Sequence, residues 1–313
     1  MYKVGIDLGG TTAKIAFVAD GAGIVMKTKI PTRCEMGYQQ VFSDIAECVK
    51  ENILKLNVTE EAIDGIGLAT PGLLSEDGNE IVFAANLNFV GVDAIGELKK
   101  YFKCRIAMAN DANAAALGEH LFGAGKGSHS SVTITIGTGI GSGIIINDRL
   151  VPGSFNSGAE IGHQIVEANG RECPCGQRGC MEQYASASAL IRCAKEQLTE
   201  NPDSSMLTAL NGDISNLNAQ TVYDAYHAGD EAATHVVEKF IKYLGIGVIN
   251  IINILQPEVI VIGGGVSGEK EKLIDPLNEY IKGHLLFGEK NFKTKVRYAT
   301  LGNDAGVIGA AML

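Results

Sequence analysis

Four residues of the types that bind zinc lie close together in the second half of the sequence. They are His163, Cys173, Cys175 and Cys180. One imidazole and three thiolates make a complete tetrahedral ligand set, which leaves no position for water and is typical of a structural zinc site. Glycines in the same loop permit the sharp turns that would bring the sulfurs together. This spacing argues against three reduced cysteines without a metal, so the sequence predicts a structural Zn²⁺ site.

Two carboxylates, Glu160 and Glu182, flank the predicted metal ligands. A zinc ion with four ligands has no place for them. We therefore expect both to accept hydrogen bonds from a polyol, with the metal fixing their positions. His163 could bind the metal through one ring nitrogen and offer the other nitrogen to the same polyol.

Three glycine-rich turns follow apolar stretches and could bind phosphate. Their residues are Asp7, Gly9, Gly10, Thr11 and Thr12; Gly137, Thr138 and Gly139 within the longer turn Gly137–Gly143; and Gly263, Gly264 and Gly265. Glycine turns expose backbone N–H groups to a phosphate, and Thr hydroxyls add donors. Asp7 is placed to hold Mg²⁺ through water. The first two turns could bind a triphosphate together and the third could approach a nucleoside, although each alone is also compatible with an ordinary tight turn.

Asn110 and Asp111 follow an apolar stretch at the point where an alanine-rich helix is predicted to begin. A carboxylate at the end of a strand, where a sheet opens to a crevice, is well placed for general-base chemistry. Asn and Asp also cap helix N-termini routinely, and position alone favours that structural role.

The elements that would position these residues alternate between strand and helix. Predicted strands are Tyr2–Leu8, Ile15–Ala19, Ile24–Ile30, Ile63–Ala69, Arg105–Ala109, Val132–Ile136, Ile144–Asn147, Val259–Ile262 and Val296–Thr300. Predicted helices span 37–56, 93–102, 112–122, 186–198 and 219–255, with others from about 267 and from Asn303. A turn is expected at Asp20–Gly23. The strand–turn–strand pattern near the N-terminus recurs around 132–147, which an internal duplication would explain.

Composition narrows the function classes. The chain has 313 residues with a formal charge of −10, and no basic footprint for nucleic acid is visible. Its most apolar stretch, Ile246–Ile254, is too short and polar to span a bilayer, and no signal peptide fits, so we expect a cytoplasmic protein.

Four further cysteines are expected to be small buried hydrophobes, and five histidines are expected at the surface or at caps. They are Cys34, Cys48, Cys104 and Cys193, and His120, His129, His227, His235 and His284.

The glycine-rich turns, the Asn110–Asp111 pair and the predicted metal-binding motif described above resemble those of the ROK family of sugar kinases and sugar-responsive repressors. Within that family they are most similar to the bacterial glucokinases. The resemblance covers nearly the whole chain, and the run from Cys173 to Glu182, with Glu160–His163 before it, is its most specific part. It implies an α/β actin-like ATPase (ribonuclease H-like) fold, with two domains around a cleft. The smaller domain would comprise 1–118 and a C-terminal helix at 301–313, and the larger 119–300.

The resemblance also implies roles for individual residues. Asp111 would be the catalytic base, and zinc would be held by the four residues named above. Sugar hydroxyls would be bound by Gly72, Asn86, Asn110, Asp111, Glu160, His163 and Glu182. The implied reaction is transfer of phosphate from Mg-ATP to the 6-hydroxyl of glucose. Gln164 departs from the glucokinase pattern, where methionine is common, and weakens the assignment of glucose.

Several alternatives remain at this stage. The sugar could be N-acetylmannosamine, fructose, mannose or allose. A sugar-responsive repressor or non-catalytic sensor is disfavoured because the first glycine turn begins at Asp7, which leaves no room ahead of it for a DNA-binding segment, and because the charge is acidic. A zinc-ribbon module lacks a second cysteine pair, and a polyphosphate-using kinase would need a basic groove. Family members are often homodimers, which is the expectation here.

Overall fold

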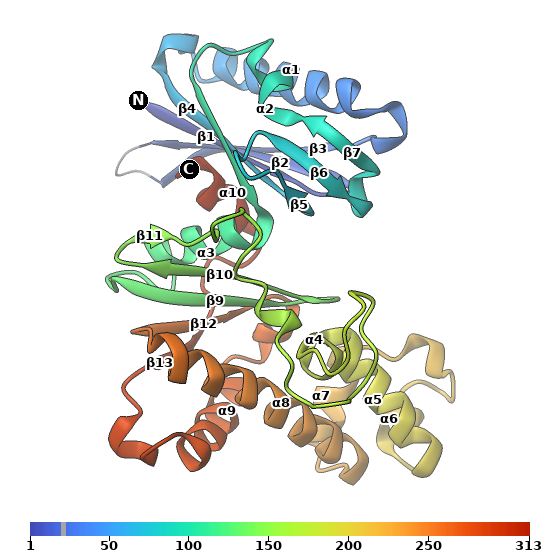
Figure 1. Cartoon of the computed structure of the whole chain (residues 1–313). Helices are drawn as coiled ribbons and strands as arrows, with labels where there is room; N and C mark the ends of the chain where they lie inside the picture. The colour runs from blue at the N-terminus through green and yellow to red at the C-terminus, as the bar shows by residue number, and fades with distance from the viewer. Residues whose placement is uncertain (20–22) are drawn as a thin grey trace. The chain divides into compact units, whose positions relative to one another are not determined.

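The computed structural model describes residues 1–19 and 23–313, which form two compact units (Figure 1). Unit 1 comprises Met1–Thr133, Gly143–Ala159 and Thr300–Leu313, and unit 2 comprises Ile134–Ser142 and Glu160–Ala299. Most of the turn predicted at Asp20–Gly23 lies outside the described residues. The strand predicted before it is confirmed, and it begins earlier than predicted, at Thr12.

The first sheet contains five strands in the order β3-β2-β1-β4-β8. Their bounds are β1 Tyr2–Leu8, β2 Thr12–Ala19, β3 Gly23–Pro31, β4 Ile63–Thr70 and β8 Arg105–Asn110. The strands β1, β2 and β3 pair antiparallel, as expected for consecutive hairpins, whereas β1, β4 and β8 pair parallel. The parallel strands therefore end at one edge of the sheet, and this edge carries the polar residues that follow them.

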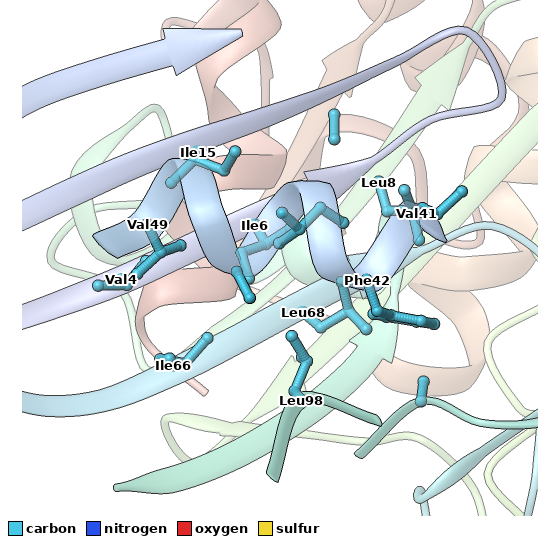
Figure 2. Close-up of a cluster of buried hydrophobic side chains, with 14 of the residues drawn as sticks. Val4, Ile6, Leu8, Ile15, Val41, Phe42, Val49, Ile66, Leu68 and Leu98 are labelled. Carbon is cyan, nitrogen blue, oxygen red and sulfur yellow. The ribbon is translucent and has the colours of Figure 1, made fainter. Parts of the chain in front are cut away.

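One face of this sheet is covered by α1 (Tyr38–Lys55), and α2 (Ala94–Lys99) adds to the same core. Alternation along β1 points Val4, Ile6 and Leu8 toward this core, where all three are fully buried. On α1, Phe42 and Val49 recur at helical spacing and meet them (Figure 2).

The other face of the sheet is covered by the C-terminal helix α10 (Ala305–Ala311), which also packs against α3 (Asp111–Phe122) (Figure 1). This packing depends on residues that lack a side chain. A Cβ atom at Gly5 or Gly67 in the sheet would overlap backbone oxygens of α10, and one at Gly309 would overlap the Ala114 oxygen of α3. The helix backbones and the strands therefore approach more closely than any larger residue would allow.

A small antiparallel sheet in the order β5-β6-β7 was not predicted. Its strands are β5 Leu73–Leu74, β6 Glu80–Ala84 and β7 Phe89–Asp93. They are short, and their alternation is blurred because Phe83 and Val90 are exposed while Ile81 and Phe89 are buried. This sheet contributes to the core on the α1 side through its buried residues.

The second five-stranded sheet has the order β11-β10-β9-β12-β13. Its strands are β9 Ser130–Ile136, β10 Ile140–Ile146, β11 Arg149–Leu150, β12 Val259–Gly263 and β13 Lys295–Tyr298. Taken in chain order within each sheet, both sheets read third-second-first-fourth-fifth. In both, the third strand pairs antiparallel with the second and the fourth pairs parallel with the fifth. The shared order agrees with the internal duplication suggested by the sequence.

Most of the chain between Glu160 and Ala299 is helical, and two sequence predictions for the second half of the chain need correction. Its helices are α4 Glu182–Ala185, α5 Ala187–Glu200, α6 Ser205–Ala209, α7 Ala219–His227, α8 Glu231–Leu255 and α9 Glu271–His284. The helix predicted over 219–255 is two helices, because Gly229 adopts a positive φ of 82° between them. The predicted turn Gly137–Gly143 is shorter, because β10 already begins at Ile140 rather than at Ile144.

Candidate active site and metal centre

In unit 1, the edge where the parallel strands end gathers the predicted catalytic residues. Asp7 is level with Ala69 of β4, and Asn110 ends β8 opposite Thr70. Asp111 follows as the first residue of α3. Such an edge is where ligands bind in open α/β sheets, because the loops that leave parallel strands diverge there.

Asp111 is a carboxylate whose surroundings disfavour its charge. Burial raises the pKa of Asp111, and the nearby charge of Asp7 raises it further, although a hydrogen bond from the Ala112 N–H opposes the shift. That N–H donates to both Asp111 Oδ1 and Asn110 Oδ1, each at 2.9 Å. Helix capping and a chemical role are therefore compatible here, since Asn110 already provides the cap.

Asp7 is paired with a lysine that the sequence reading overlooked. Lys14 lies directly opposite Asp7 in the β1–β2 hairpin, and its Nζ is 2.9 Å from Asp7 Oδ2. The same Nζ donates to the Asn303 carbonyl at 3.0 Å. The register of the hairpin was the available signal, because a turn centred on Gly9–Thr12 places residues 7 and 14 side by side. Among the described residues no partner is recorded for Asp7 Oδ1, so this oxygen suits a magnesium-bound water.

The remaining unit 1 candidates lie around the same edge. A Cβ atom at Gly10 would overlap the backbone carbonyl oxygen of Asn86, so the first glycine turn directly contacts a residue predicted to bind sugar. The Asn110 side-chain amide donates to the Gly72 carbonyl at 3.4 Å. The turn itself is closed by the Gly9 N–H, which donates to Thr12, and is tied to Thr32, whose N–H donates to the Thr11 carbonyl.

In unit 2, the four predicted metal ligands converge. Their donor atoms all lie within 4.8 Å of one another. Cys173 Sγ is 3.8 Å from His163 Nδ1, and Cys175 Sγ is 3.6 Å from Cys180 Sγ. Thiolates bound tetrahedrally to zinc at about 2.3 Å are roughly 3.8 Å apart, so the spacing and chemistry of this donor set fit the ion.

The thiols of this group titrate differently because their surroundings differ. A backbone hydrogen bond from Gln177 lowers the pKa of Cys175 to about 7. Burial, together with hydrogen bonds to Cys173 and Cys175, raises the pKa of Cys180 to about 12. Three thiolates this close repel one another, and a cation between them would relieve that repulsion.

Of the four cysteines outside this group, Cys48 and Cys193 are buried as expected, whereas Cys34 and Cys104 are only partly buried. Burial raises the pKa of the four thiols, which keeps them protonated and unreactive. They are Cys34, Cys48, Cys104 and Cys193. The expectation for His120 was wrong, since its ring is buried and bonded to Ser131 Oγ at 2.9 Å and Asp148 Oδ1 at 3.3 Å.

Glu182 lies between the metal ligands and the second glycine turn. It begins α4, two residues after Cys180, and its Oε2 accepts a hydrogen bond from the Ile140 N–H at 2.8 Å. A Cβ atom at Gly139 would overlap this same oxygen. The turn Gly137–Gly139 and the predicted sugar ligand are thus in direct contact.

The segment that carries Glu160 and His163 is also anchored on β10. It forms a short 3₁₀ helix, Ile161–His163, whose first N–H donates to Ser142 Oγ at 3.1 Å. A Cβ atom at Gly162 would overlap the Ile140 oxygen. The third glycine turn lies against β9, because a Cβ atom at Gly264 would overlap the Ile136 backbone. Gly264 also has a positive φ of 84°.

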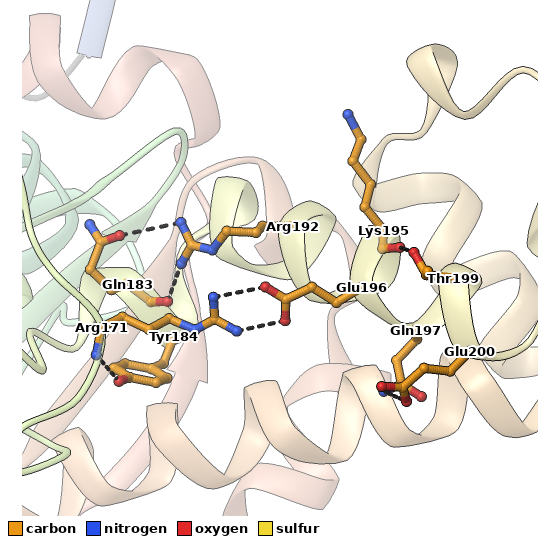
Figure 3. A network of polar contacts seen from close by, with 9 residues as sticks. All are labelled: Arg171, Gln183, Tyr184, Arg192, Lys195, Glu196, Gln197, Thr199 and Glu200. Atoms are coloured by element: carbon orange, nitrogen blue, oxygen red, sulfur yellow. Dashed lines mark hydrogen bonds and ion pairs between the residues drawn. The ribbon is translucent and has the colours of Figure 1, made fainter.

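We call the segment that carries the four candidate ligands, residues 163–180, the metal-binding loop. A polar network fixes this loop and α4 on the helices of unit 2 (Figure 3). The Arg171 guanidinium donates to both carboxylate oxygens of Glu196 in α5, at 2.8 and 2.6 Å. The Tyr184 hydroxyl accepts a hydrogen bond from the Arg171 N–H at 2.6 Å, and Arg192 donates to the Gln183 carbonyl. Bidentate arginine–carboxylate pairs define geometry as well as contributing energy, so the loop is held in one orientation.

Known proteins resemble this chain along its full length. The ROK family matches residues 3–313. A glucokinase of Halalkalibacterium halodurans is 38% identical over 314 aligned residues, covering 100% of this chain and 94% of the relative. A glucokinase of Thermotoga maritima is 35% identical, covering 99% of this chain and 96% of the relative. The crystal structure of a ROK family glucokinase from Streptomyces griseus, in complex with glucose and AMPPNP, superposes with a TM-score of 0.81 at 30% identity, covering 100% of this chain and 98% of that one.

These matches show that the chain has the actin-like ATPase fold of sugar kinases. The chain belongs to the ROK family. The family and the fold expected from the motifs are therefore confirmed. Among the described residues, none of the helices has both the length and the apolar character needed to cross a membrane.

Proposed function

We propose that this protein is a glucokinase, which transfers the γ-phosphoryl group of Mg-ATP to the 6-hydroxyl of glucose. The observation that carries the proposal is the placement of Asp111, a carboxylate of raised pKa near Asp7, directly after β8 at the edge where parallel strands end. Relatives named glucokinase at 38% and 35% identity over nearly the whole chain support glucose as the substrate.

In the proposed reaction, Asp111 accepts the proton of the 6-hydroxyl as that oxygen attacks the γ-phosphorus. The bond between the γ-phosphorus and the bridging oxygen breaks, and ADP leaves with the bonding electrons. A carboxylate with a raised pKa is a better proton acceptor than one with an ordinary pKa, provided that it is still ionised at the working pH. Phosphoryl transfer otherwise depends on positioning and charge neutralisation, which suits a site built from backbone N–H groups.

The other candidate residues divide between sugar and nucleotide. The residues that would bind hydroxyls of glucose are Gly72, Asn86, Asn110, Asp111, Glu160, His163 and Glu182. The N–H groups of the first two glycine turns would bind phosphates, Asp7 would hold magnesium through water, and the third turn would approach the nucleoside. His163 and the three cysteines would hold zinc as a closed four-ligand site, in which the ion would stabilise the loop and take no part in the transfer.

The test is a coupled assay of ADP release with purified protein, Mg-ATP and a panel of sugars. Glucose, mannose, fructose, allose and N-acetylmannosamine are compared by kcat/KM. We expect glucose to exceed the others by at least tenfold. A higher kcat/KM for another sugar would reassign the substrate and retain the kinase, and a flat response to every sugar would refute kinase activity toward these sugars. A cytoplasmic location remains a prediction from the sequence, and a homodimeric state remains what the family resemblance implies.

A further inference from the structure

The carboxylate of Glu182 makes a contact that binding sugar does not require. Its Oε2 accepts the Ile140 N–H at 2.8 Å, immediately after the second glycine turn, and the same oxygen fills the space beside Gly139. Hydrogen bonds to a charged acceptor are about twice as strong as neutral ones, so this contact defines where the turn lies. Among the described residues, no hydrogen bond is recorded for the other oxygen, Oε1.

The position of Glu182 is itself fixed by its neighbours. The Gln183 N–H donates to the Cys180 carbonyl at 3.0 Å, and the carbonyl of Gln183 accepts from Arg192. The next residue, Tyr184, accepts a hydrogen bond from the N–H of Arg171 (Figure 3). Its ring packs against that of Tyr243, with centroids 4.3 Å apart. A shift of Glu182 is therefore resisted by the metal-binding loop and by two helices.

We infer that Glu182 is a positioning residue for the phosphate-binding turn Gly137–Gly139 as well as a sugar ligand, and that it couples the two substrates. One oxygen holds the turn while the other is available to a sugar hydroxyl. Sugar that binds to Oε1 restrains the carboxylate and thereby restrains the turn, and a turn ordered by phosphate restrains the carboxylate in return. Such coupling is reciprocal by thermodynamic necessity. The inference rests on the proposed function for the identity of both ligands.

The first arm of the test measures nucleotide binding with no sugar present. Mg²⁺ with a non-hydrolysable ATP analogue is titrated by calorimetry into the wild type, Glu182→Ala and Glu182→Gln. We expect Glu182→Ala to weaken nucleotide binding about 10-fold or more, because the Ile140 N–H loses a charged acceptor. Glu182→Gln keeps an oxygen that can accept this N–H and should recover much of the loss. A residue that served sugar alone would leave both variants at the wild-type dissociation constant, and that result would overturn the inference.

The second arm measures whether a change in the glycine turn alters sugar binding, with a matched pair of variants in one turn. A Cβ atom at Gly139 would overlap Glu182 Oε2, whereas one at Gly137 would meet nothing within 4 Å. Neither glycine has a positive φ, so alanine fits the backbone at both positions. Glucose is titrated without nucleotide. We expect Gly139→Ala to raise the glucose dissociation constant about 10-fold and Gly137→Ala to change it less than twofold. Equal constants for the two variants would contradict the coupling.

Two controls separate this inference from the proposed function and from misfolding. Thermal unfolding and bound-zinc content of each variant show whether unit 2 is intact, and the Glu182→Gln variant keeps the comparison valid if Glu182→Ala does not fold. Failure of the wild type to phosphorylate glucose would sink the proposed function, while the nucleotide titrations, which contain no sugar, would still decide whether Glu182 holds the turn.

Discussion

At Asp111, the requirements of stability and of the proposed function conflict. Its folded-state pKa is raised, mainly by burial. Its contribution to stability is therefore complete below the pKa of the unfolded chain and is lost as the pH rises through the folded-state pKa, so the ionised form destabilises the fold at neutral pH. Active sites commonly retain such groups because the chemistry needs them.

Replacement of Asp111 by Asn should separate the two effects. We expect kcat to fall roughly 10²–10⁴-fold, the usual range for loss of a general base. We also expect the melting temperature at pH 7 to rise, because a neutral amide has no charge to desolvate and its oxygen still accepts the Ala112 N–H. The coupled assay and thermal unfolding measure the two quantities. Wild-type turnover would refute the assignment, and a lower melting temperature would contradict the argument from desolvation.

The same raised pKa predicts the pH dependence of the reaction. A general base must be ionised, so kcat should fall tenfold per pH unit below the pKa of Asp111 in the substrate complex. Because this pKa lies above that of an exposed aspartate, near 3.9, the acid limb should begin at a higher pH than 3.9. A profile of kcat against pH, with coupling enzymes in excess at each pH, checks this. A rate that stays flat down to pH 4 would be inconsistent with a base of raised pKa.

At this scale, sequence reasoning identified residue types better than partners. The four metal ligands could be predicted because their chemistry and spacing lie within one loop. Whether Asp111 is a cap or a base could not be decided, since both roles need a carboxylate at a helix start, and burial is a property of the folded chain. The contact between Glu182 and Gly139 joins residues that are far apart in the sequence, so no local pattern indicates it.

At the scale of elements, the metal-binding loop is the one whose stability depends most on a ligand. We expect Cys175→Ser to lose bound zinc, to lower the melting temperature and to raise KM for glucose more than it lowers kcat. In the proposed site, zinc bound to Cys180 would hold Glu182 in place, and the proposed base, Asp111, lies elsewhere in the sequence. Metal analysis, thermal unfolding and steady-state kinetics test this prediction.

Cys104→Ser is the control for that experiment. Cys104 is partly buried in unit 1, outside the metal-binding group, and burial keeps its thiol protonated. This variant should therefore retain zinc and the wild-type KM. A native protein that contains no zinc, or a Cys175→Ser variant with full zinc content, would contradict the role of the loop.

The elements that the sequence predicted well are those with a strong period and a buried face. The strand Tyr2–Leu8 and the helix α1 are of this kind. The small sheet β5-β6-β7 was missed because its strands are two to five residues long and expose some large apolar side chains. The break between α7 and α8 was missed because Gly229 reads as tolerable within a helix, although its positive φ ends the helical run.

For the whole molecule, the packing of α10 on unit 1 leads to a prediction about glycine. Gly309→Ala should destabilise the protein by several kcal/mol, because the added methyl group overlaps the Ala114 oxygen and forces α3 and α10 apart. Gly283→Ala in α9 is the matched control: a Cβ atom there meets nothing within 4 Å, and alanine favours the helix by up to about 1 kcal/mol. Thermal or denaturant unfolding should shift in opposite directions for the two variants. Equal shifts would show that the close approach carries no energetic weight.

The overall architecture could be predicted only through family resemblance and the repeated strand–turn–strand pattern. Local patterns give the strands but not their order, because the order depends on which apolar faces pair across long stretches of chain. The two sheets share one order of strands, so a single topological rule describes both. A sequence-level duplication thus predicts more of the fold than any single element does.

The return of the C-terminal helix to the first sheet also bears on how the protein is made. The strands of that sheet leave the ribosome first, yet the face opposite α1 is not covered until Ala305–Ala311 has emerged. At synthesis rates of about 5–20 residues per second, this interval lasts on the order of tens of seconds. Throughout it, a glycine-bearing face of the nascent sheet remains open to chaperones or to other chains. Unit 2, whose residues all precede Thr300, can complete its fold before unit 1 does.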